Sequence, residues 1–300
     1  MSHDQRRASD GGRFKKPPLR VFTTTLWEYP SQHYESANAP LQGDPNYTGA
    51  TPSWVIWQVL TRYTRDNDLI LDPMCGSGTT LDVCKDLSRR GLGFDLAPRR
   101  PDIQHADARE LPIEDSTADF VFIDPPYSTH IDYSDDPRCI GKLDAGEEPA
   151  DSGPSARHDE SGGATDRADH TARLNSAGDD DRDDPATPER TGAEYYDAME
   201  EVIAECHRVL KNRRYLALYV SDSWKKRRGE PGAGGGQFMP IGFELFSILR
   251  DYFEPIDIIA VVRHNQKLAR GNWHKAAEEQ NFFLRGFNYL FIMKKTEPRA

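Results

Sequence analysis

The chain has 300 residues, 37% of them hydrophobic and 10% aromatic, so it can bury the core of one large domain or two small ones. No apolar run approaches the ~18 residues that a membrane span needs, and the N-terminus has no apolar leader, so we expect a cytoplasmic protein without membrane contact. The four cysteines lack Cys-x-x-Cys spacing and the nine histidines form no ligand pattern, so we expect no metal site.

The net charge of −11 argues against a nucleic-acid binder until it is localised. Residues 144–190 hold 14 Asp/Glu and 5 Arg, a net of −9, which leaves −2 for the rest of the chain. This segment has no aromatic residue and is rich in Gly, Ser, Pro and Ala, so we expect a disordered insertion. The remaining body is nearly neutral, and a nucleic-acid substrate is therefore not excluded.

The order of the predicted elements indicates an α/β fold. Predicted helices cover residues 54–63, 81–87, 195–210 and 241–253, the first with Ser53 as N-cap. Predicted strands cover residues 69–71, 91–96, a short stretch before Asp107, 120–123, 215–220, 256–262 and 289–293. Strands that alternate with helices predict a doubly wound, mostly parallel sheet. The last two strands lie in a helix-poor stretch, which predicts one antiparallel edge strand.

The segment DPMCGSGTT, residues 72–80, lies between a predicted strand and a predicted helix. A glycine-rich turn in this position lets the backbone approach a ligand closely. It lacks the third glycine of GxGxxG and the lysine of a P-loop, which disfavours dinucleotide dehydrogenases and NTPases. Asp95 ends the next strand, where an acid commonly holds two ribose hydroxyls. Asp107 follows the third strand and could accept a bond from an adenine amino group, so we expect an adenosine cofactor without phosphates.

A second motif, DPPY at residues 124–127, follows the buried strand predicted at residues 120–123. Neither proline can donate a ladder hydrogen bond, and each has φ fixed near about −65°. The result is a stiff turn with free carbonyls at the carboxyl end of a strand, where open α/β sheets bind ligands.

The two motifs together resemble the S-adenosylmethionine-dependent amino-methyltransferases of DNA, which methylate exocyclic nitrogens of bases and have a Rossmann-like class I fold. That family has a first motif close to D-P-F-x-G-S-G-T-T, with Phe where this chain has Met74, and a second motif Asp/Asn/Ser-Pro-Pro-Tyr/Phe/Trp. The segment TGATPSWVIWQVL, residues 48–60, resembles the family's methionine-side segment, and the likeness extends to residue 294. The cofactor-binding residues implied by it and by the loop are Thr51, Asp72, Met74, Cys75, Gly76, Gly78, Thr79, Asp95 and Asp107.

The resemblance also implies a catalytic role for Asp124, Pro125, Pro126 and Tyr127. Asp124 and the Pro125 carbonyl would each accept one N–H of the amino group, which turns the nitrogen lone pair toward the methyl donor. Tyr127 would stack on a base extruded from the duplex. The alternatives of a capping role for Asp124 and a core role for Tyr127 stay open. His130, Asp132 and Tyr133 border the base pocket or belong to a solvated loop.

Two basic stretches are candidate nucleic-acid contacts, and a solvated surface is the alternative for each. We expect the first to be a mobile loop, and the candidate residues of the two stretches are Lys225, Lys226, Arg227, Arg228, Arg263, Lys267, Arg270 and Trp273. We therefore divide the chain into a basic arm and lead-in (1–45), a cofactor-binding and catalytic half (46–142), the acidic insertion (143–192) and a second half with basic loops (193–296).

The leading hypothesis is a DNA methyltransferase acting on adenine N6, because Asp in the first position of the second motif is more common in adenine enzymes. Cytosine N4 stays open. A guanine-N2 tRNA methyltransferase is a further alternative, disfavoured because those enzymes usually carry an RNA-binding domain upstream and only 71 residues precede Asp72. A non-catalytic cofactor-binding subunit of a defence complex is the last. DNA is the expected substrate, and a restriction or defence subunit is a candidate partner.

Overall fold

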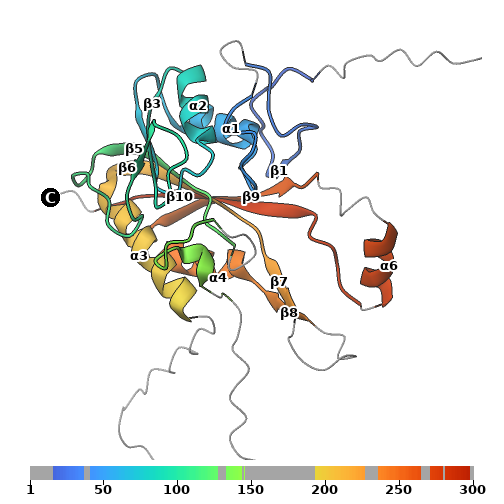
Figure 1. The fold of residues 1–300 in the computed structure, drawn as a ribbon. Coiled ribbons are helices and arrows are strands. Elements are labelled where there is room, and N and C mark those ends of the chain that lie inside the picture. The colour runs from blue at the N-terminus through green and yellow to red at the C-terminus, as the bar shows by residue number, and fades with distance from the viewer. Residues whose placement is uncertain are drawn as a thin grey trace, which may run out of the picture.

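The computed structural model describes residues 16–36, 41–127, 133–143, 145, 193–226, 236–264, 271–279 and 281–297. Most of its strands belong to one sheet: β1 (Leu26–Trp27), β2 (Leu69–Asp72), β3 (Arg90–Asp95), β4 (Ile103–His105), β5 (Ala118–Ile123), β6 (Leu210–Val220), β9 (Glu254–Val262) and β10 (Phe287–Lys294). Within the described residues the strand order is β1-β9-β10-β6-β5-β2-β3-β4 (Figure 1). Apart from residues 143 and 145, the predicted acidic insertion (143–192) lies outside these ranges, as do residues 1–15 of the basic arm.

The sheet is mostly parallel, as predicted. Strands β4, β3, β2, β5 and β6 are parallel neighbours, and β1 pairs parallel with β9. The expected antiparallel strand is β10, which pairs antiparallel with both β6 and β9. It belongs to the edge region of the sheet without being the outermost strand, because β9 and the two-residue β1 continue the sheet beyond it.

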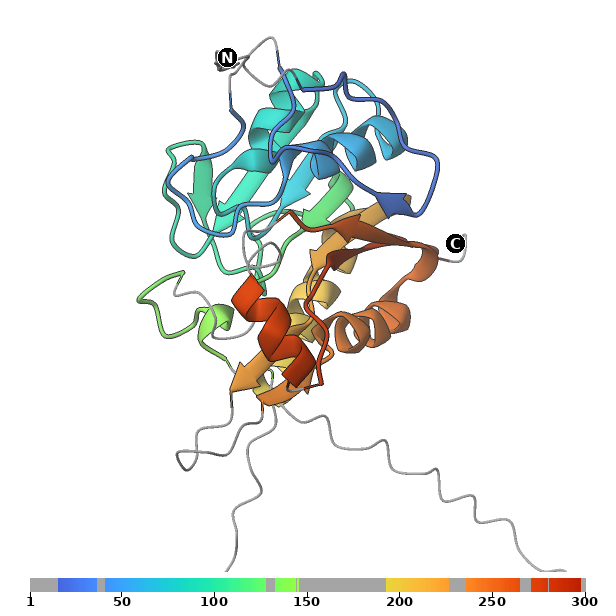
Figure 2. The same cartoon turned by 90° about the vertical axis from the view of Figure 1, so that its right-hand side faces the viewer.

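Helices cover both faces of the sheet. Helices α1 (Ser53–Tyr63) and α2 (Thr79–Asp86) lie on one face, and α3 (Ala193–Val209) and α4 (Ile241–Tyr252) on the other (Figures 1 and 2). Strand β5 is buried on both sides: Phe120 and Phe122 belong to the α1 side of the core, and Val121 and Ile123 to the α3 side. This explains the continuous apolar run that predicted the strand.

Several predicted boundaries were wrong for local reasons. Pro52, not Ser53, holds the N-cap position of α1, and the Ser53 hydroxyl instead donates to Gln42 Oε1 at 2.8 Å. Helix α2 begins at Thr79, two residues earlier than predicted, because Gly78 adopts the left-handed conformation at its N-cap with φ 77°. Strand β6 begins at Leu210 rather than at residue 215, since its first residues are mostly polar and show no strand pattern.

The lead-in before α1 packs on the body. Trp27, Tyr29 and Tyr34 are buried, and the Tyr34 hydroxyl donates to Asp86 Oδ2 at 2.6 Å. The Trp27 ring meets Phe22 edge-on, with 5.9 Å between the ring centroids. Residues 16–36 therefore complete the core on the α1 side of the sheet.

Residues 223–226 are a strand and not the loop that was predicted. Strand β7 (Ser223–Lys226) pairs antiparallel with β8 (Gly236–Met239), and the hairpin extends away from the main sheet (Figure 1). The run of basic residues concealed this strand in the sequence. Helix α6 (Gly271–Glu279) was also not predicted. No helix in the described part of the chain is long and apolar enough to cross a membrane.

Candidate active site

A cavity of about 440 Å³ opens at the carboxyl ends of β2, β3, β5 and β6. Its size is within the usual range for small-molecule sites, roughly 300–1,000 Å³. All predicted catalytic and cofactor-binding residues line it except Gly78 and Pro125. Gly78 lies at the start of α2, and Pro125 is buried within the turn after β5.

The glycine loop after β2 is shaped by two residues with positive φ. Gly76 has φ 45°, and its backbone N–H donates to Asp95 Oδ2 at 2.8 Å. A Cβ atom on Gly76 would lie 2.7 Å from the Tyr47 hydroxyl oxygen, so a side chain at this position would enter space held by Tyr47. The loop therefore requires glycine for both its conformation and its close packing.

Asp72 braces this loop from the end of β2. Its Oδ1 accepts the Met74 backbone N–H at 3.1 Å, and its Oδ2 accepts the Thr80 hydroxyl at 2.5 Å. Burial raises the pKa of Asp72 to about 7, against the effect of these two hydrogen bonds. Cys75 and Thr79 are also almost fully buried. These two predicted cofactor residues therefore expose little surface to the pocket and contribute mainly to the structure of the loop.

Asp95 and Asp107 mark the end of the pocket beside β3 and β4. Asp95 Oδ1 accepts the Ala97 backbone N–H at 2.8 Å. Asp107 accepts two bonds from the Arg109 side chain, at 3.0 Å from Nε and 2.7 Å from Nη2. Although burial opposes its charge, these bonds hold the pKa of Asp107 below the ordinary value. Leu96 and Ala108 add apolar wall next to the two carboxylates.

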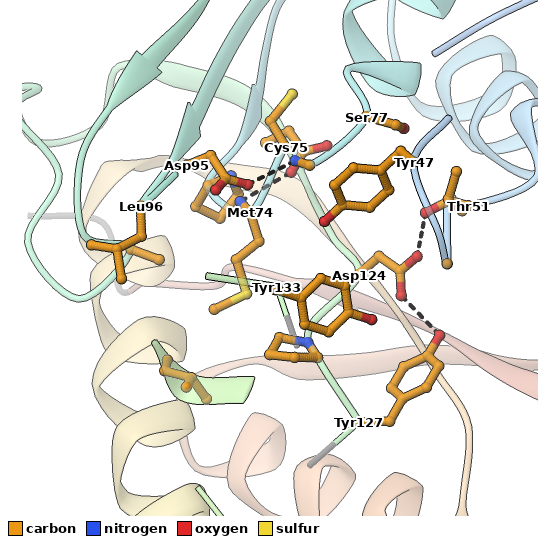
Figure 3. Close-up of a pocket in the computed structure, with 18 of the residues that line it drawn as sticks. Tyr47, Thr51, Met74, Cys75, Ser77, Asp95, Leu96, Asp124, Tyr127 and Tyr133 are labelled. Atoms are coloured by element: carbon orange, nitrogen blue, oxygen red, sulfur yellow. Dashed lines mark hydrogen bonds between the residues drawn. The ribbon is translucent and has the colours of Figure 1, made fainter. Parts of the chain in front are cut away.

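Asp124 lies at the opposite end of the pocket with both carboxylate oxygens engaged. Its Oδ2 accepts the Thr51 hydroxyl, and its Oδ1 accepts the Tyr127 hydroxyl at 2.8 Å (Figure 3). Burial raises the pKa of Asp124 to about 7, although both hydroxyls favour the charged form. Thr51 was predicted to contact a cofactor, and its observed hydrogen bond joins it to the predicted catalytic carboxylate.

The turn after β5 is fixed from helix α3. The hydroxyl of Tyr195, a fully buried residue, donates to the Pro126 carbonyl at 2.8 Å. No described residue donates to the Pro125 carbonyl. From the sequence, we expect the Pro125 carbonyl to accept an N–H of the base. Among the described residues, this carbonyl has no donor, whereas the Pro126 carbonyl has one.

Two tyrosines complete the wall between the glycine loop and Asp124. The Tyr47 and Tyr133 ring centroids are 6.2 Å apart, and the Arg99 guanidinium lies 5.3 Å from the Tyr47 ring centroid. Burial and the neighbouring Asp95 raise the pKa of Tyr47 above its ordinary value. Figure 3 shows the Met74 side chain pointing into the space next to these rings.

The sequence analysis missed Tyr47 and left Tyr133 undecided. The aromatic residue directly after the turn-forming stretch Asp44–Pro45–Asn46 was the available signal for Tyr47. Tyr133 lines the pocket, whereas His130 and Asp132 lie outside the described residues.

Of the predicted nucleic-acid-binding residues that the structure describes, only Arg263 lines the pocket. It donates to the Ser221 hydroxyl at 2.9 Å. Trp273 is on α6, and Lys225 and Lys226 are on β7. Four others lie outside the described residues: Arg227, Arg228, Lys267 and Arg270. Among the residues that the structure describes, no group of three or more His, Cys, Asp or Glu is placed to hold a metal ion.

Solved structures that this chain resembles loosely include a SAM-dependent methyltransferase from Methanosarcina mazei, 14% identical, with a TM-score of 0.40 over 80% of this chain and 98% of that chain. A structure described as a DNA modification methylase from Thermus thermophilus, complexed with S-adenosyl-L-methionine, is 17% identical, with a TM-score of 0.27 over 36% of this chain and 39% of that chain. Both overlaps are loose, and the family assignment comes from sequence.

Curated relatives match over short stretches. Type II methyltransferase M.HpaI of Haemophilus parainfluenzae is 33% identical over 73 residues, which is 24% of this chain and 22% of the relative. Type II methyltransferase M.BamHI of Bacillus amyloliquefaciens is 31% identical over 98 residues, which is 31% of this chain and 22% of the relative. The chain thus spans about a fifth of the length of each. The sequence model of the N6/N4 DNA methylases matches residues 2–104 and 118–299, and the chain therefore belongs to this family of DNA methylases.

Proposed function

We propose that the protein transfers a methyl group from S-adenosylmethionine to an exocyclic amino nitrogen of a DNA base, namely adenine N6. The observation that carries the proposal is the placement of Asp124. Its carboxylate lies at one end of the cavity, held by the hydroxyls of Thr51 and Tyr127, directly before a turn fixed by two prolines and Tyr195. This is a preorganised acceptor for an amino group.

The pocket fits the proposed methyl donor. Asp95 would hold the ribose hydroxyls and Asp107 the adenine amino group, with Leu96 and Ala108 against the apolar faces. The aromatic rings of Tyr47 and Tyr133 lie between this end and Asp124, where they suit a sulfonium cation. When bound, S-adenosylmethionine supplies an electrophilic methyl group.

Asp124 and the Pro125 carbonyl would act on the amino group of the base. Each accepts one N–H, which draws the nitrogen toward tetrahedral geometry and frees its lone pair for bonding to the methyl carbon. Asp124 also opposes the positive charge that develops on the nitrogen. Because its pKa is raised to about 7, the same carboxylate is suited to take up the proton that the methylated nitrogen releases near neutral pH.

Tyr127 would stack on the target base. Its hydroxyl donates to Asp124 Oδ1, so the ring cannot turn without breaking a 2.8 Å hydrogen bond. A base stacked on this ring would bring its amino group next to the carboxylate. A base inside a duplex cannot reach the pocket, so the proposal requires base extrusion.

The choice of adenine rests on Asp124 as the first residue of its motif, the residue more common in adenine enzymes. The names of the curated relatives place them among Type II methyltransferases. We extend this to a role in restriction–modification, with DNA as substrate and an endonuclease as a candidate partner.

The test is incubation with methyl-labelled S-adenosylmethionine and either unmethylated genomic DNA or tRNA, followed by mass spectrometry of the nucleosides. We expect label in N6-methyladenine of DNA, lost in Asp124→Ala and kept in Asp66→Ala, whose side chain is 76% exposed. Label in N4-methylcytosine would show that the target base is cytosine and not adenine. Label in tRNA guanine would show that the substrate is RNA and not DNA. Absence of label despite cofactor binding would overturn the enzymatic role.

A further inference from the structure

An aromatic cluster that contains one arginine lies at the β7–β8 hairpin, and we define it as Trp224, Phe238, Phe282, Arg285 and the neighbouring Phe283. Trp224 and Phe238 are register partners in the hairpin, and the Trp224 and Phe282 ring centroids are 5.8 Å apart. The Arg285 guanidinium lies 4.6 Å from the Phe238 ring centroid and 6.0 Å from that of Trp224. These distances are those of cation–π contacts.

The aromatic cluster is on the surface. Phe283 is 87% exposed, Phe238 43% and Trp224 39%. Exposed aromatic side chains gathered at one place often mark an interaction site. Arg285 Nε is buried and has no hydrogen-bond partner among the described residues, so the guanidinium is left with the rings and with the Phe283 carbonyl, which Nη1 contacts at 3.0 Å.

The cluster is joined to the rim of the active-site pocket on two sides. Ser223 lines the pocket, and Trp224 is the next residue of β7. Arg263 also lines the pocket, and its backbone N–H donates at 2.9 Å to the carbonyl of Gly286, which follows Arg285. A ligand that enters the pocket from a larger molecule therefore brings that molecule close to the cluster.

We propose that the aromatic cluster stacks on the DNA bases that are exposed when the target base leaves the duplex, an inference that rests on the proposed function. Extrusion costs a few kcal/mol because neighbouring bases lose their stacking partner. Exposed rings of the cluster, of which Phe283 is the most exposed, can take the place of that partner. Arg285 is the only charged member of the cluster. Together with Arg263 at the pocket rim it gives this surface a positive charge, which attracts phosphates. This favours nucleic acid over a protein partner as the occupant.

The test measures binding and does not depend on methyl transfer. The probes are a dye-labelled single-stranded oligodeoxynucleotide, its duplex and dye-labelled heparin, a polyanion without bases. We expect Phe283→Ala to weaken binding of both DNA probes by roughly tenfold, the usual effect of removing one stacking ring, and to leave heparin binding unchanged. Phe283→Trp should keep DNA affinity. Phe243→Ala is the matched control, since Phe243 is 62% exposed and lies on α4 outside the cluster.

Equal DNA affinity of the wild type and Phe283→Ala would overturn the inference and assign the surface to another partner. An equal loss for DNA and heparin would overturn it as well, because it would indicate a general loss of charge contact or fold. If the wild type binds DNA through Phe283 but transfers no methyl group, the proposed function fails while the stacking surface stands. If the wild type methylates DNA and Phe283→Ala binds DNA with wild-type affinity, the stacking surface fails while the proposed function stands.

Discussion

The hydroxyl of Tyr195 donates a 2.8 Å hydrogen bond to the carbonyl of Pro126, linking the first turn of α3 to the turn after β5 across 69 positions of sequence. Tyr195 is fully buried, so its hydroxyl reaches the turn from inside the core. A buried carbonyl left without a partner costs about 1–3 kcal/mol. The turn can relieve that cost by shifting, which would move the neighbouring Pro125 carbonyl and Asp124.

We therefore predict that Tyr195→Phe lowers kcat for methyl transfer at least tenfold while the affinity for S-adenosylmethionine changes less than twofold. Tyr196→Phe is the matched control, because Tyr196 is the next residue, is also buried, and its hydroxyl makes only a 3.5 Å contact with the Ala145 carbonyl. Single-turnover kinetics and calorimetric titration measure the two quantities. A parallel loss of kcat in both variants would contradict a positioning role for Tyr195.

Asp124 predicts a pH dependence of activity. Its carboxyl must be ionised to oppose the positive charge that develops on the nitrogen and to take up the released proton, and burial raises its pKa to about 7. For the free enzyme we expect kcat/KM to fall about tenfold per pH unit below that pKa and to level off above it. Thr51→Val removes a donor that stabilises the charged form, so the pKa of Asp124 rises and the profile moves to higher pH. The expected shift is about one to two units, since a hydrogen bond to a charged group contributes about 1.5–3 kcal/mol.

Thr117→Val is the control for this shift. Thr117 is partly exposed, and its hydroxyl bonds the Glu114 carbonyl, so the pH profile should match that of the wild type. A Thr51→Val profile with the wild-type midpoint and a lower plateau would show that Thr51 acts on substrate or cofactor and not through the Asp124 carboxylate.

The parts of the site that follow strand ends could be predicted from sequence. Asp72 and Asp95 end β2 and β3, and Asp124 follows β5, so parallel pairing alone brings them to one edge of the sheet. Local pattern also located β5, because a strand buried on both faces leaves a continuous apolar run.

Contacts between distant segments could not be predicted in this way. Tyr195 has the pattern of an ordinary buried helix position, and nothing local shows that its hydroxyl meets Pro126. Tyr47 reaches the glycine loop through the path of the lead-in chain, which sequence periodicity does not describe. Strand β7 was missed because its basic residues suggested a solvated loop, whereas pairing of Trp224 with Phe238 stabilises a strand.

The conformation of the glycine loop predicts that a side chain at Gly76 strongly weakens cofactor binding. Its φ of 45° costs a residue with a side chain about 1–2 kcal/mol, and a Cβ there would lie 2.7 Å from the Tyr47 hydroxyl oxygen. We expect Gly76→Ala to lower the affinity for S-adenosylmethionine at least tenfold, measured by calorimetric titration. Gly271→Ala is the control, because a Cβ at Gly271 meets no atom within 4 Å. Unchanged affinity in Gly76→Ala would mean that the cofactor does not contact this turn.

Arg100 holds the glycine loop from outside the pocket. Its guanidinium makes two 2.8 Å bonds to Asp82 and bonds of 2.9 and 2.8 Å to Asp102, and Nη1 lies 3.3 Å from the carbonyls of Ser77 and Gly78. The Arg100 side chain is 19% exposed, so the network is partly screened by water. We expect Arg100→Met to lower the free energy of unfolding by about 1–3 kcal/mol, between the values for exposed and buried ion pairs.

Urea denaturation measures this loss, and Arg138→Met is its control. Arg138 also forms a two-bond contact with a carboxylate, that of Asp136, but its side chain is 54% exposed and the contact joins residues two positions apart. Removal of Arg138 should therefore leave unfolding unchanged. Because Arg100 also contacts the loop carbonyls, its loss should weaken cofactor binding at temperatures where the protein is still folded. A stability loss with full cofactor affinity would show that Arg100 stabilises α2 without shaping the loop.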